Sequence, residues 1–356
     1  MITLVITNRN RDLQIVKNCF DSLYSQSDQD FQWCVVDYGS DPEYLVKFTD
    51  LVAEYPQIKL ILCPVSKQLW NKSRAINIVL QQTETLCFFV GDIDMMYDVD
   101  FISTVKSLYS ENQATYFQVG FLDQKESTFS KPFTDYKIAF KSTTDATGMT
   151  LYPTQALKNI NGYDEFYHGW GAEDTDVHQR LANADYQICY YDKSILMLHQ
   201  WHPKAYRKTT GNTLFHSELE RINSEYLSFS ALAKIQKANN NGEWGKSPVV
   251  SDYQSLSGNP DLLLDVDSQS TTFFGIISQF PNFFGIILEL KIKSSPANKI
   301  FKQNLKKIAG KKHINYLDLE IANNFLLEEI VRHYRNLPYE YNFDRTNQII
   351  HLKIKF

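Results

Sequence analysis

The sequence predicts an α/β protein, in which a mostly parallel sheet flanked by helices precedes a smaller α+β domain. Three observations lead to this prediction. Strand-like and helix-like segments alternate through residues 2–90. The length of 356 residues corresponds to about two domains. Residues 1–200 carry 16 basic and 26 acidic side chains, whereas the rest of the chain carries 20 and 15. Such charge asymmetry indicates two parts with different roles.

The first strand and helix follow from local patterns. Ile2–Thr7 is a short β-branched run, which is typical of a buried strand. Asp12 can cap a helix that follows it. In that helix Leu13, Val16 and Phe20 recur at helical spacing, so one face is apolar.

The alternation then continues. We expect strands at Phe31–Val36, Lys59–Cys63 and Leu86–Val90. Helices are expected at Glu43–Glu54 and Trp70–Gln81. Strands joined by helices form a parallel sheet, and ligands bind beyond the carboxyl ends of its strands.

From residue 115 the pattern is looser. Residues 116–121 and 188–198 contain strands, and residues 169–182 form a turn that leads into a helix. Between them, 123–148 reads as a long polar loop. Loops of that length on such scaffolds are often functional lids.

A polar segment rich in Asn, Ser, Gly and Pro at 239–260 predicts a linker, which separates residues 1–238 from residues 261–356. In the second part, Phe273–Ile277 and Phe283–Ile287 both read Phe-Phe-Gly-Ile-Ile. We expect a pair of strands there, joined by a turn.

The end of the chain completes the α+β domain. Two helices are expected at 297–309 and 317–335, and a final strand pair near 340–356. Ser295-Pro296 is a favourable start for the first of these helices.

Composition excludes several classes of protein. No run of 18 apolar residues is present, so no membrane-spanning helix is expected. The apolar start, Ile2–Thr7, is too short for a signal peptide. The five cysteines lack metal-ligand and redox spacing, which favours a reduced, cytoplasmic protein. They are Cys19, Cys34, Cys63, Cys87 and Cys189.

Asp92 and Asp94 directly follow the apolar run Leu86–Val90. A turn at the end of that strand lets both carboxylates reach one ligand, and carboxylate oxygens suit Mg²⁺ or Mn²⁺ bound to phosphates. A solvated acidic turn is the alternative interpretation, because Asp-x-Asp is common.

A more specific motif spans Gly169–Asp176 and reads Gly-Trp-Gly-Ala-Glu-Asp-Thr-Asp. Its glycines allow close backbone approach, and Trp170 offers a flat face for a sugar ring. The acids, Glu173 and Asp174 first, also stabilise the dipole of a helix that starts there. That structural role explains the acids but leaves the Gly-Trp-Gly unexplained.

His199 lies at the end of an expected strand, and His202 follows three residues later. A histidine at a strand end is often structural. Beside Asp92 and Asp94, however, an imidazole favours Mn²⁺ slightly over Mg²⁺.

Four further polar residues lie near expected strand ends or helix starts. Asp37 ends the second strand, where its carboxylate can bind a base or ribose or cap the turn. Lys72, Arg74 and Asn77 lie at a helix start, where a cation can meet a diphosphate or simply face solvent.

In this order, the motifs over residues 1–215 resemble the GT-A glycosyltransferases of glycosyltransferase family 2. The later part is similar to the carboxy-terminal motif of β-1,4-galactosyltransferases and bacterial chondroitin polymerases. The resemblance implies a Rossmann-like GT-A fold. Its carriers are Thr7, Val36–Ser40, Arg74–Asn77, Asp92–Asp94, Gly169–Asp174 and His199-Gln200.

The resemblance implies a UDP-sugar donor. Thr7 and Asp37 would bind its uridine, and Arg74 and Asn77 would lie against the nucleotide. Asp92 would contact the ribose or the donor sugar.

The resemblance also implies a divalent cation and a single base. Asp94 and His199 would be the metal ligands, with His202 and Asp92 as further candidates. Asp174 would be the general base and Glu173 would orient the acceptor. One base without a carboxylate nucleophile predicts single displacement with inversion.

The predicted function is therefore transfer of a hexose or N-acetylhexosamine from a UDP-sugar to a glycan or glycolipid acceptor, in bacterial surface polysaccharide or glycolipid synthesis. Two alternatives remain open. One is a metal-dependent nucleotidyl or phosphoryl enzyme that uses the same Asp92 and Asp94. The other is a non-catalytic scaffold that binds nucleotide sugars or glycans.

Residues 290–313 contain eight lysines and no acid. An amphipathic helix within this stretch predicts peripheral contact with an anionic membrane. The alternative is a solvated helix packed on its own domain. Nucleic acid is not an expected partner, because the stretch lacks a recognised binding module.

Overall fold

The computed structural model describes residues 1–203, 217–240 and 243–356, which divide into two compact units. The expected linker, 239–260, contains the last residues of the first unit and helix α8 (Val250–Ser255) of the second. A domain boundary within that segment remains a proposal. Where the structure describes them, Met1–Ser66, Asn71–Lys204 and Asn223–Ser247 form the first unit, and Lys67–Trp70, Ala205–Ile222 and Pro248–Phe356 form the second.

The first unit is built on a seven-stranded sheet with the order β10-β6-β9-β4-β1-β2-β3. All neighbours in this sheet are parallel except β9, which pairs antiparallel with both β4 and β6. The predicted mostly parallel α/β architecture is therefore confirmed. The strands are β1 (Ile2–Asn8), β2 (Phe31–Tyr38), β3 (Ile58–Cys63), β4 (Cys87–Asp92), β6 (Gln113–Phe117), β9 (Thr150–Pro153) and β10 (Gln187–Tyr191).

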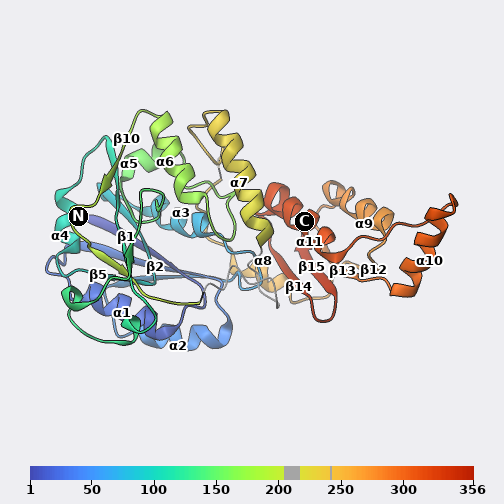
Figure 1. The fold of residues 1–356 in the computed structure, drawn as a ribbon, viewed down its shortest axis with the longest axis horizontal. Helices are drawn as coiled ribbons and strands as arrows, with labels where there is room; N and C mark the ends of the chain where they lie inside the picture. The colour runs from blue at the N-terminus through green and yellow to red at the C-terminus, as the bar shows by residue number, and fades with distance from the viewer. Residues whose placement is uncertain (204–216, 241–242) are drawn as a thin grey trace. The chain divides into compact units, whose positions relative to one another are not determined.

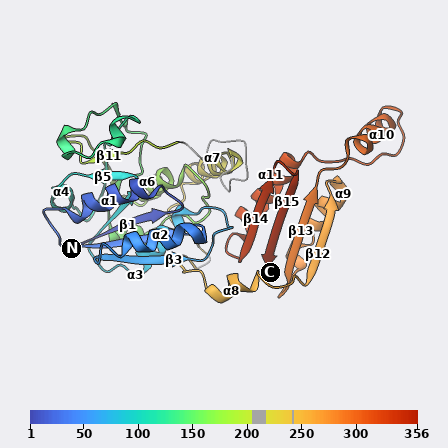
Figure 2. The same cartoon turned by 90° about the horizontal axis from the view of Figure 1, so that it is seen from below.

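Helices cover both faces of this sheet (Figure 1, Figure 2). The Asp12 carboxylate accepts hydrogen bonds from the backbone N–H groups of Gln14 and Ile15, so α1 begins as expected. Val16 and Phe20 of α1 are buried in the core between this helix and the sheet. One face carries α1 (Leu13–Tyr24), α2 (Pro42–Val52) and α4 (Phe101–Ser107), and the other carries α3 (Lys72–Gln82), α5 (Thr154–Asn159) and α6 (Glu173–Asn183). Helix α7 (Ser217–Leu232) follows later in the chain.

A second, four-stranded sheet with the order β5-β11-β7-β8 lies in the same unit. It joins segments that are far apart in the sequence. Strand β11 pairs antiparallel with β5 and parallel with β7. Part of the polar segment 123–148 contributes β8, so this segment is not only a loop. The strands are β5 (Met95–Tyr97), β7 (Gly120–Phe121), β8 (Phe140–Lys141) and β11 (Met197–His199).

The second unit contains a four-stranded sheet with the order β12-β13-β15-β14 and the helices α9, α10 and α11. In β13 the buried Leu288, Leu290 and Ile292 alternate with the charged Glu289 and Lys291, so one face of the sheet is apolar. The elements are β12 (Leu262–Asp267), α9 (Ser270–Ile277), β13 (Ile287–Lys293), α10 (Ala297–Ile308), α11 (Leu319–Glu329), β14 (Tyr339–Asp344) and β15 (Ile349–Lys355).

The expected helices and the final strand pair of this unit are confirmed, but the strand pair at the repeated pentapeptide is wrong. The first copy, Phe273–Ile277, lies in helix α9. The second copy meets β13 only at Ile287, because Gly285 takes a left-handed φ of 67° that interrupts a strand. Five apolar residues without alternation fit either structure, so their neighbours decide between helix and strand.

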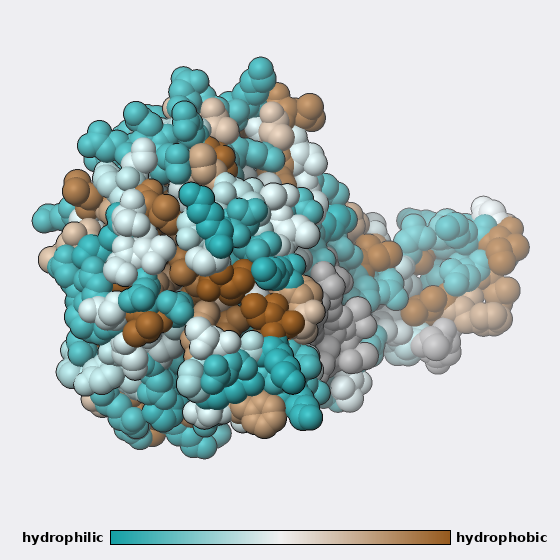
Figure 3. Space-filling model, turned by 60° about the vertical axis from the view of Figure 1, so that its left-hand side comes forward, coloured by the Kyte–Doolittle hydropathy of each residue, from teal (hydrophilic) through white to brown (hydrophobic). Residues whose placement is uncertain are grey.

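Among the described residues, no helix combines the length and the apolar character that a membrane crossing needs. Figure 3 shows mostly hydrophilic residues on one face of the molecule, with apolar residues gathered near the middle of that face.

Candidate active site

Three of the predicted donor-binding residues lie at the carboxyl edge of the large sheet. The strand register places Thr7 of β1 beside Asp92 of β4, and Asn8 beside Asp37 of β2. This is the edge at which parallel α/β sheets bind ligands.

Asp37 is buried and already accepts several hydrogen bonds. Asn8 Nδ2 donates to Oδ2 at 2.7 Å, while the backbone N–H and the hydroxyl of Ser40 donate at 2.9 and 2.6 Å. Burial raises the pKa of Asp37, and these donors oppose that rise. The carboxylate therefore holds the turn that follows β2, and uridine binding by Asp37 stays a prediction.

Arg74 and Asn77 form hydrogen bonds that connect other segments to α3. The Asn77 amide is fully buried, donates to the Tyr163 carbonyl at 2.8 Å and to Glu165 Oε1 at 3.0 Å, and accepts from the Tyr163 N–H. Arg74 Nε donates to the Lys246 carbonyl at 3.2 Å. The structure does not bring these two side chains to the acids at Asp92 and Glu173-Asp174, and their contact with a nucleotide stays a prediction.

Lys72 lies two residues before Arg74, on a different side of α3, and its ammonium group lies close to three carboxylates. Helix residues two apart lie about 200° apart around the axis. Lys72 Nζ lies 3.1 Å from Asp92 Oδ1, 3.4 Å from Asp174 Oδ2 and 3.7 Å from Glu173 Oε1. Sequence reasoning offered Lys72 as a cation for a diphosphate but did not predict this cluster, because it joins β4, α3 and α6.

An unusual backbone turn delivers two of these acids. Gly169, Gly171 and Ala172 have φ values of 76°, 93° and 79°, all left-handed. Glycine adopts this conformation freely, whereas alanine does so at a cost of about 1 kcal/mol. The turn ends at the cap of α6, so that Glu173 opens the helix. The indole of Trp170 is 48% exposed at its start.

The acidic pair at the start of α6 is electrostatically unusual. Burial raises the pKa of Glu173 to about 7; the charge of Asp174 adds to the rise, and Lys72 opposes it. Burial lowers the pKa of Lys72, but the three carboxylates outweigh burial and raise it overall. Asp174 Oδ1 is buried and has no hydrogen-bond partner among the described residues. One acid of the pair can therefore carry a proton at neutral pH, while its neighbour has an oxygen with no donor in the described part of the chain.

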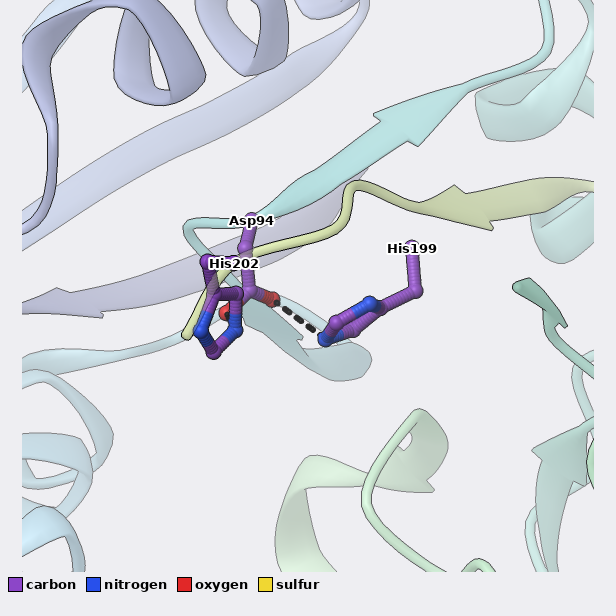
Figure 4. A group of neighbouring side chains, drawn as sticks. All are labelled: Asp94, His199 and His202. Carbon is purple, nitrogen blue, oxygen red and sulfur yellow. Dashed lines mark ion pairs between the residues drawn. The ribbon is translucent and has the colours of Figure 1, made fainter. Parts of the chain in front are cut away.

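Asp94, His199 and His202 form a second cluster (Figure 4). The Nε2 atoms of His199 and His202 lie 3.8 Å from Asp94 Oδ1 and 3.1 Å from Asp94 Oδ2. One ligand atom of each residue falls within 4.8 Å of the others. Asp94 Oδ1 is buried without a hydrogen-bond partner among the described residues. An unsatisfied carboxylate oxygen between two imidazoles is a donor set that fits a divalent transition-metal ion.

The pKa shifts of Asp94 and His199 favour the ionised carboxylate and the neutral imidazole. Burial raises the pKa of Asp94, but His202, His199 and Arg11 outweigh burial and lower it. Arg11 is 3.1 Å from Asp94 Oδ2. Burial lowers the pKa of His199, and the charge of Asp94 opposes this effect. Ionised carboxylate and neutral imidazole are the forms that bind metals.

Aromatic rings hold His199 in place. The Phe121 ring lies nearly parallel to the imidazole with centroids 4.7 Å apart, and Phe140 stacks on Phe121 at 4.6 Å. The backbone N–H of Gln200 donates to the Asp94 carbonyl at 2.9 Å, which ties the two ligand-bearing segments together. Sequence reasoning missed both phenylalanines, because nothing local to 121 or 140 points to residue 199.

Two family models match this chain. Residues 3–160 match the model described as glycosyl transferase family 2, and residues 127–202 match the model described as the N-terminal domain of galactosyltransferase. Together the matches include Thr7, Asp92, Asp94, Asp174 and His199.

Among curated proteins, the chain is similar to chondroitin sulfate synthase 3. It is 22% identical to the Mus musculus protein over 173 residues and 23% identical to the Homo sapiens protein over 161 residues. These segments cover 44% and 42% of this chain, but 19% and 18% of the relatives. The chain thus spans about a fifth of the length of the curated relatives that it matches.

Solved structures show a partial likeness. S. aureus TarS 1-349 in complex with UDP-GlcNAc is 13% identical, with a TM-score of 0.48 over 67% of each chain. The mannosyltransferase PcManGT from Pyrobaculum calidifontis, in complex with GDP-Man and Mn2+, is 14% identical, with a TM-score of 0.44 over 65% of this chain and 63% of that one.

Proposed function

From the premise that this chain is a glycosyltransferase of the GT-A type, we propose that it is a metal-dependent inverting enzyme. It transfers a hexose or N-acetylhexosamine from a UDP-sugar to a hydroxyl group of a glycan or glycolipid acceptor. One observation carries the proposal. Asp92 ends β4 and Asp94 lies two residues later, in the turn before β5, so this short stretch joins the lysine–carboxylate cluster to the Asp94–His199–His202 cluster.

Asp94, His199 and His202 would hold the cation. Two imidazoles beside one carboxylate favour Mn²⁺ over Mg²⁺. A bound divalent ion supplies positive charge that stabilises a leaving diphosphate. Arg11, which contacts Asp94, adds a second positive charge at this position.

Asp174 acts as the general base. It accepts the proton of the acceptor hydroxyl while the hydroxyl oxygen forms a bond to the anomeric carbon. On the opposite face the bond from that carbon to the diphosphate oxygen breaks, and UDP leaves with the bonding electrons. A single displacement of this kind inverts the anomeric configuration. The hydroxyl becomes acidic as its bond forms, so a carboxylate is a sufficient base.

Glu173 and Trp170 position the acceptor. With a pKa near 7, Glu173 can donate a hydrogen bond in its protonated form or accept one when ionised. Trp170 supplies an exposed aromatic face on which a sugar ring can stack. We assign the acceptor to a bacterial surface polysaccharide or glycolipid that is assembled on the cytoplasmic side of the membrane.

The test is a panel of UDP-sugars with Mn²⁺, Mg²⁺ or EDTA, each in the presence and absence of glycan acceptors. We expect sugar transfer and UDP release that require both metal and acceptor, and a product of inverted configuration. Metal-dependent cleavage of the UDP-sugar at a rate that no acceptor changes would support a nucleotidyl or phosphoryl enzyme instead. A UDP-sugar that raises the melting temperature without turnover on any acceptor would support a binding scaffold.

A further inference from the structure

Helix α10 exposes its apolar side chains. Phe301, Leu305 and Ile308 are 65%, 52% and 84% exposed. Their spacing of four and three residues places them on one side of the helix. An apolar stripe of this kind normally faces a core. Here none of the described side chains from Lys299 to Ile308 is buried.

The sequence left open a solvated helix packed on its own domain, but the described side chains of α10 are exposed or half-buried rather than packed in a core. Figure 1 and Figure 2 both show α10 apart from the β12–β15 sheet. Single exposed apolar residues need no explanation, but three on one face of a short helix mark an interaction surface.

Positive charge surrounds the stripe. Lys291 and Lys293 of β13 and Lys299 of α10 lie within ion-pair distance of acids. The remaining lysines form no ion pair with any residue that the structure describes. They are Lys302, Lys306, Lys307, Lys311 and Lys312.

The segment that carries α10 leaves and rejoins the unit beside Ser268. The backbone N–H of Ser268 donates to the Lys293 carbonyl at 2.9 Å, and the Ser268 carbonyl accepts from the Leu317 N–H at 2.8 Å. The Ser294 N–H also donates to the Gln348 carbonyl, and the Asn315 carbonyl accepts from the Ser270 N–H. Residues 296–314 therefore form a segment, called the α10 segment below, whose two ends are hydrogen-bonded to the unit. These hydrogen bonds fix the two ends of the segment and do not involve helix α10 itself.

We propose that α10 docks on an anionic membrane surface, with its axis in the plane of the membrane. Twelve residues span about 18 Å, too short for a hydrocarbon core of about 30 Å. A lipid interface offers an apolar layer for Phe301, Leu305 and Ile308 and anionic headgroups for the lysines beside them. A nucleic acid would satisfy the lysines but leave the apolar stripe without a partner.

The test is co-sedimentation of the full chain with vesicles of phosphatidylcholine alone or with 30% phosphatidylglycerol (about a third of the lipid, enough for a strongly negative surface). We expect binding to the anionic vesicles only. The variant F301S/L305S/I308S should lose it. The variant K302Q/K306Q/K307Q should weaken it about a hundredfold, because each lysine near the surface contributes about fivefold.

Matched control variants test whether binding depends on this surface rather than on exposed apolar residues or positive charge in general. V46S/L232S/L263S removes three exposed apolar residues elsewhere, and K47Q/K193Q/K237Q removes three exposed lysines elsewhere. Both should bind like the wild type. Equal recovery with both vesicle types, or wild-type binding by the serine triple variant, would overturn the proposal. So would competition by duplex DNA that is insensitive to the serine substitutions.

A fluorescence measurement reads out the same contact in a second way. Phe301→Trp should show a blue-shifted emission difference with anionic vesicles, because the indole enters the apolar layer. An unchanged difference spectrum would contradict the proposed orientation. Neither experiment needs donor, acceptor or metal, so its outcome is independent of the proposed function.

Discussion

The ammonium group of Lys72 lies 3.4 Å from Oδ2 of Asp174, the side chain that we propose as the base. The same ammonium lies 3.1 Å from Asp92 at the end of β4. Lys72 therefore links the strand edge that we propose for the donor to the helix that we propose for the acceptor. Without it, three carboxylates would face one another in a partly buried space.

Replacing Lys72 with methionine should therefore destabilise the protein in a pH-dependent way. We expect a loss of about 3–5 kcal/mol at pH 8, typical of buried charges that lose their partner. At pH 5 the loss should be smaller, because the acids can then bind protons. Urea denaturation at both pH values measures the difference. Lys72→Arg, which keeps the charge, should retain most of the stability, and an equal loss at both pH values would contradict this account.

Asp174→Asn should lower kcat by about 10²–10⁴-fold, which is the contribution of a positioned general base. The amide nearly preserves the shape of the side chain but cannot accept the proton. Steady-state sugar transfer, with circular dichroism to confirm folding, provides the measurement. Asp50→Asn on the exposed face of α2 is the matched control and should be active. A near wild-type rate for Asp174→Asn would remove this residue from the role of base.

Glu173 should make stability depend on pH. Its carboxyl binds a proton more tightly in the folded protein, with a pKa of about 7, than at its ordinary value of 4.5. This favours the folded state at pH below 4.5, and the advantage is lost as the pH rises through 7. Between pH 5 and pH 8, wild type should lose on the order of 2 kcal/mol relative to Glu173→Gln. Parallel pH dependences for the two proteins would contradict the raised pKa.

The sequence predicts the strand ends well and the side-chain contacts poorly. Alternating segments locate Asp92 and Asp94 at the end of β4, because a buried strand and a turn are local patterns. In contrast, the antiparallel strand β9 enters the sheet between β4 and β6, and no local pattern shows where a strand inserts. The contact of Phe121 with His199 depends on the small second sheet, whose strands are only two or three residues long. Such short strands are set by tertiary packing.

The Asp94–His199–His202 cluster should bind Mn²⁺ in the absence of donor. We expect Asp94→Asn, His199→Ala and His202→Ala each to weaken Mn²⁺ binding at least tenfold, because each removes one of three ligands. Electron paramagnetic resonance of free Mn²⁺ gives the affinity directly. His313→Ala, a half-buried histidine in the other unit, should leave it unchanged. Wild-type affinity in all three ligand variants would show that the ion binds elsewhere.

Phe121→Leu should weaken Mn²⁺ binding by about tenfold, as is typical when a residue that orients a ligand is lost. Leucine keeps the site apolar but cannot stack on the imidazole of His199. Saturating Mn²⁺ should restore kcat, which distinguishes a positioning residue from a catalytic one. If kcat stays low at saturation, Phe121 has another role.

The hydrogen bonds that hold both ends of the α10 segment beside Ser268 have an evolutionary and practical consequence. Because the chain leaves and returns beside Ser268, while Ser294 and Asn315 stay hydrogen-bonded to the unit, a short Gly-Ser bridge can replace residues 296–314 with little effect on the sheet. The lysine-rich tip is thus a self-contained cassette that can vary in length or target independently of the catalytic unit. Grafted between two paired backbone positions of an unrelated protein, it should carry its preference for anionic lipid to the new host.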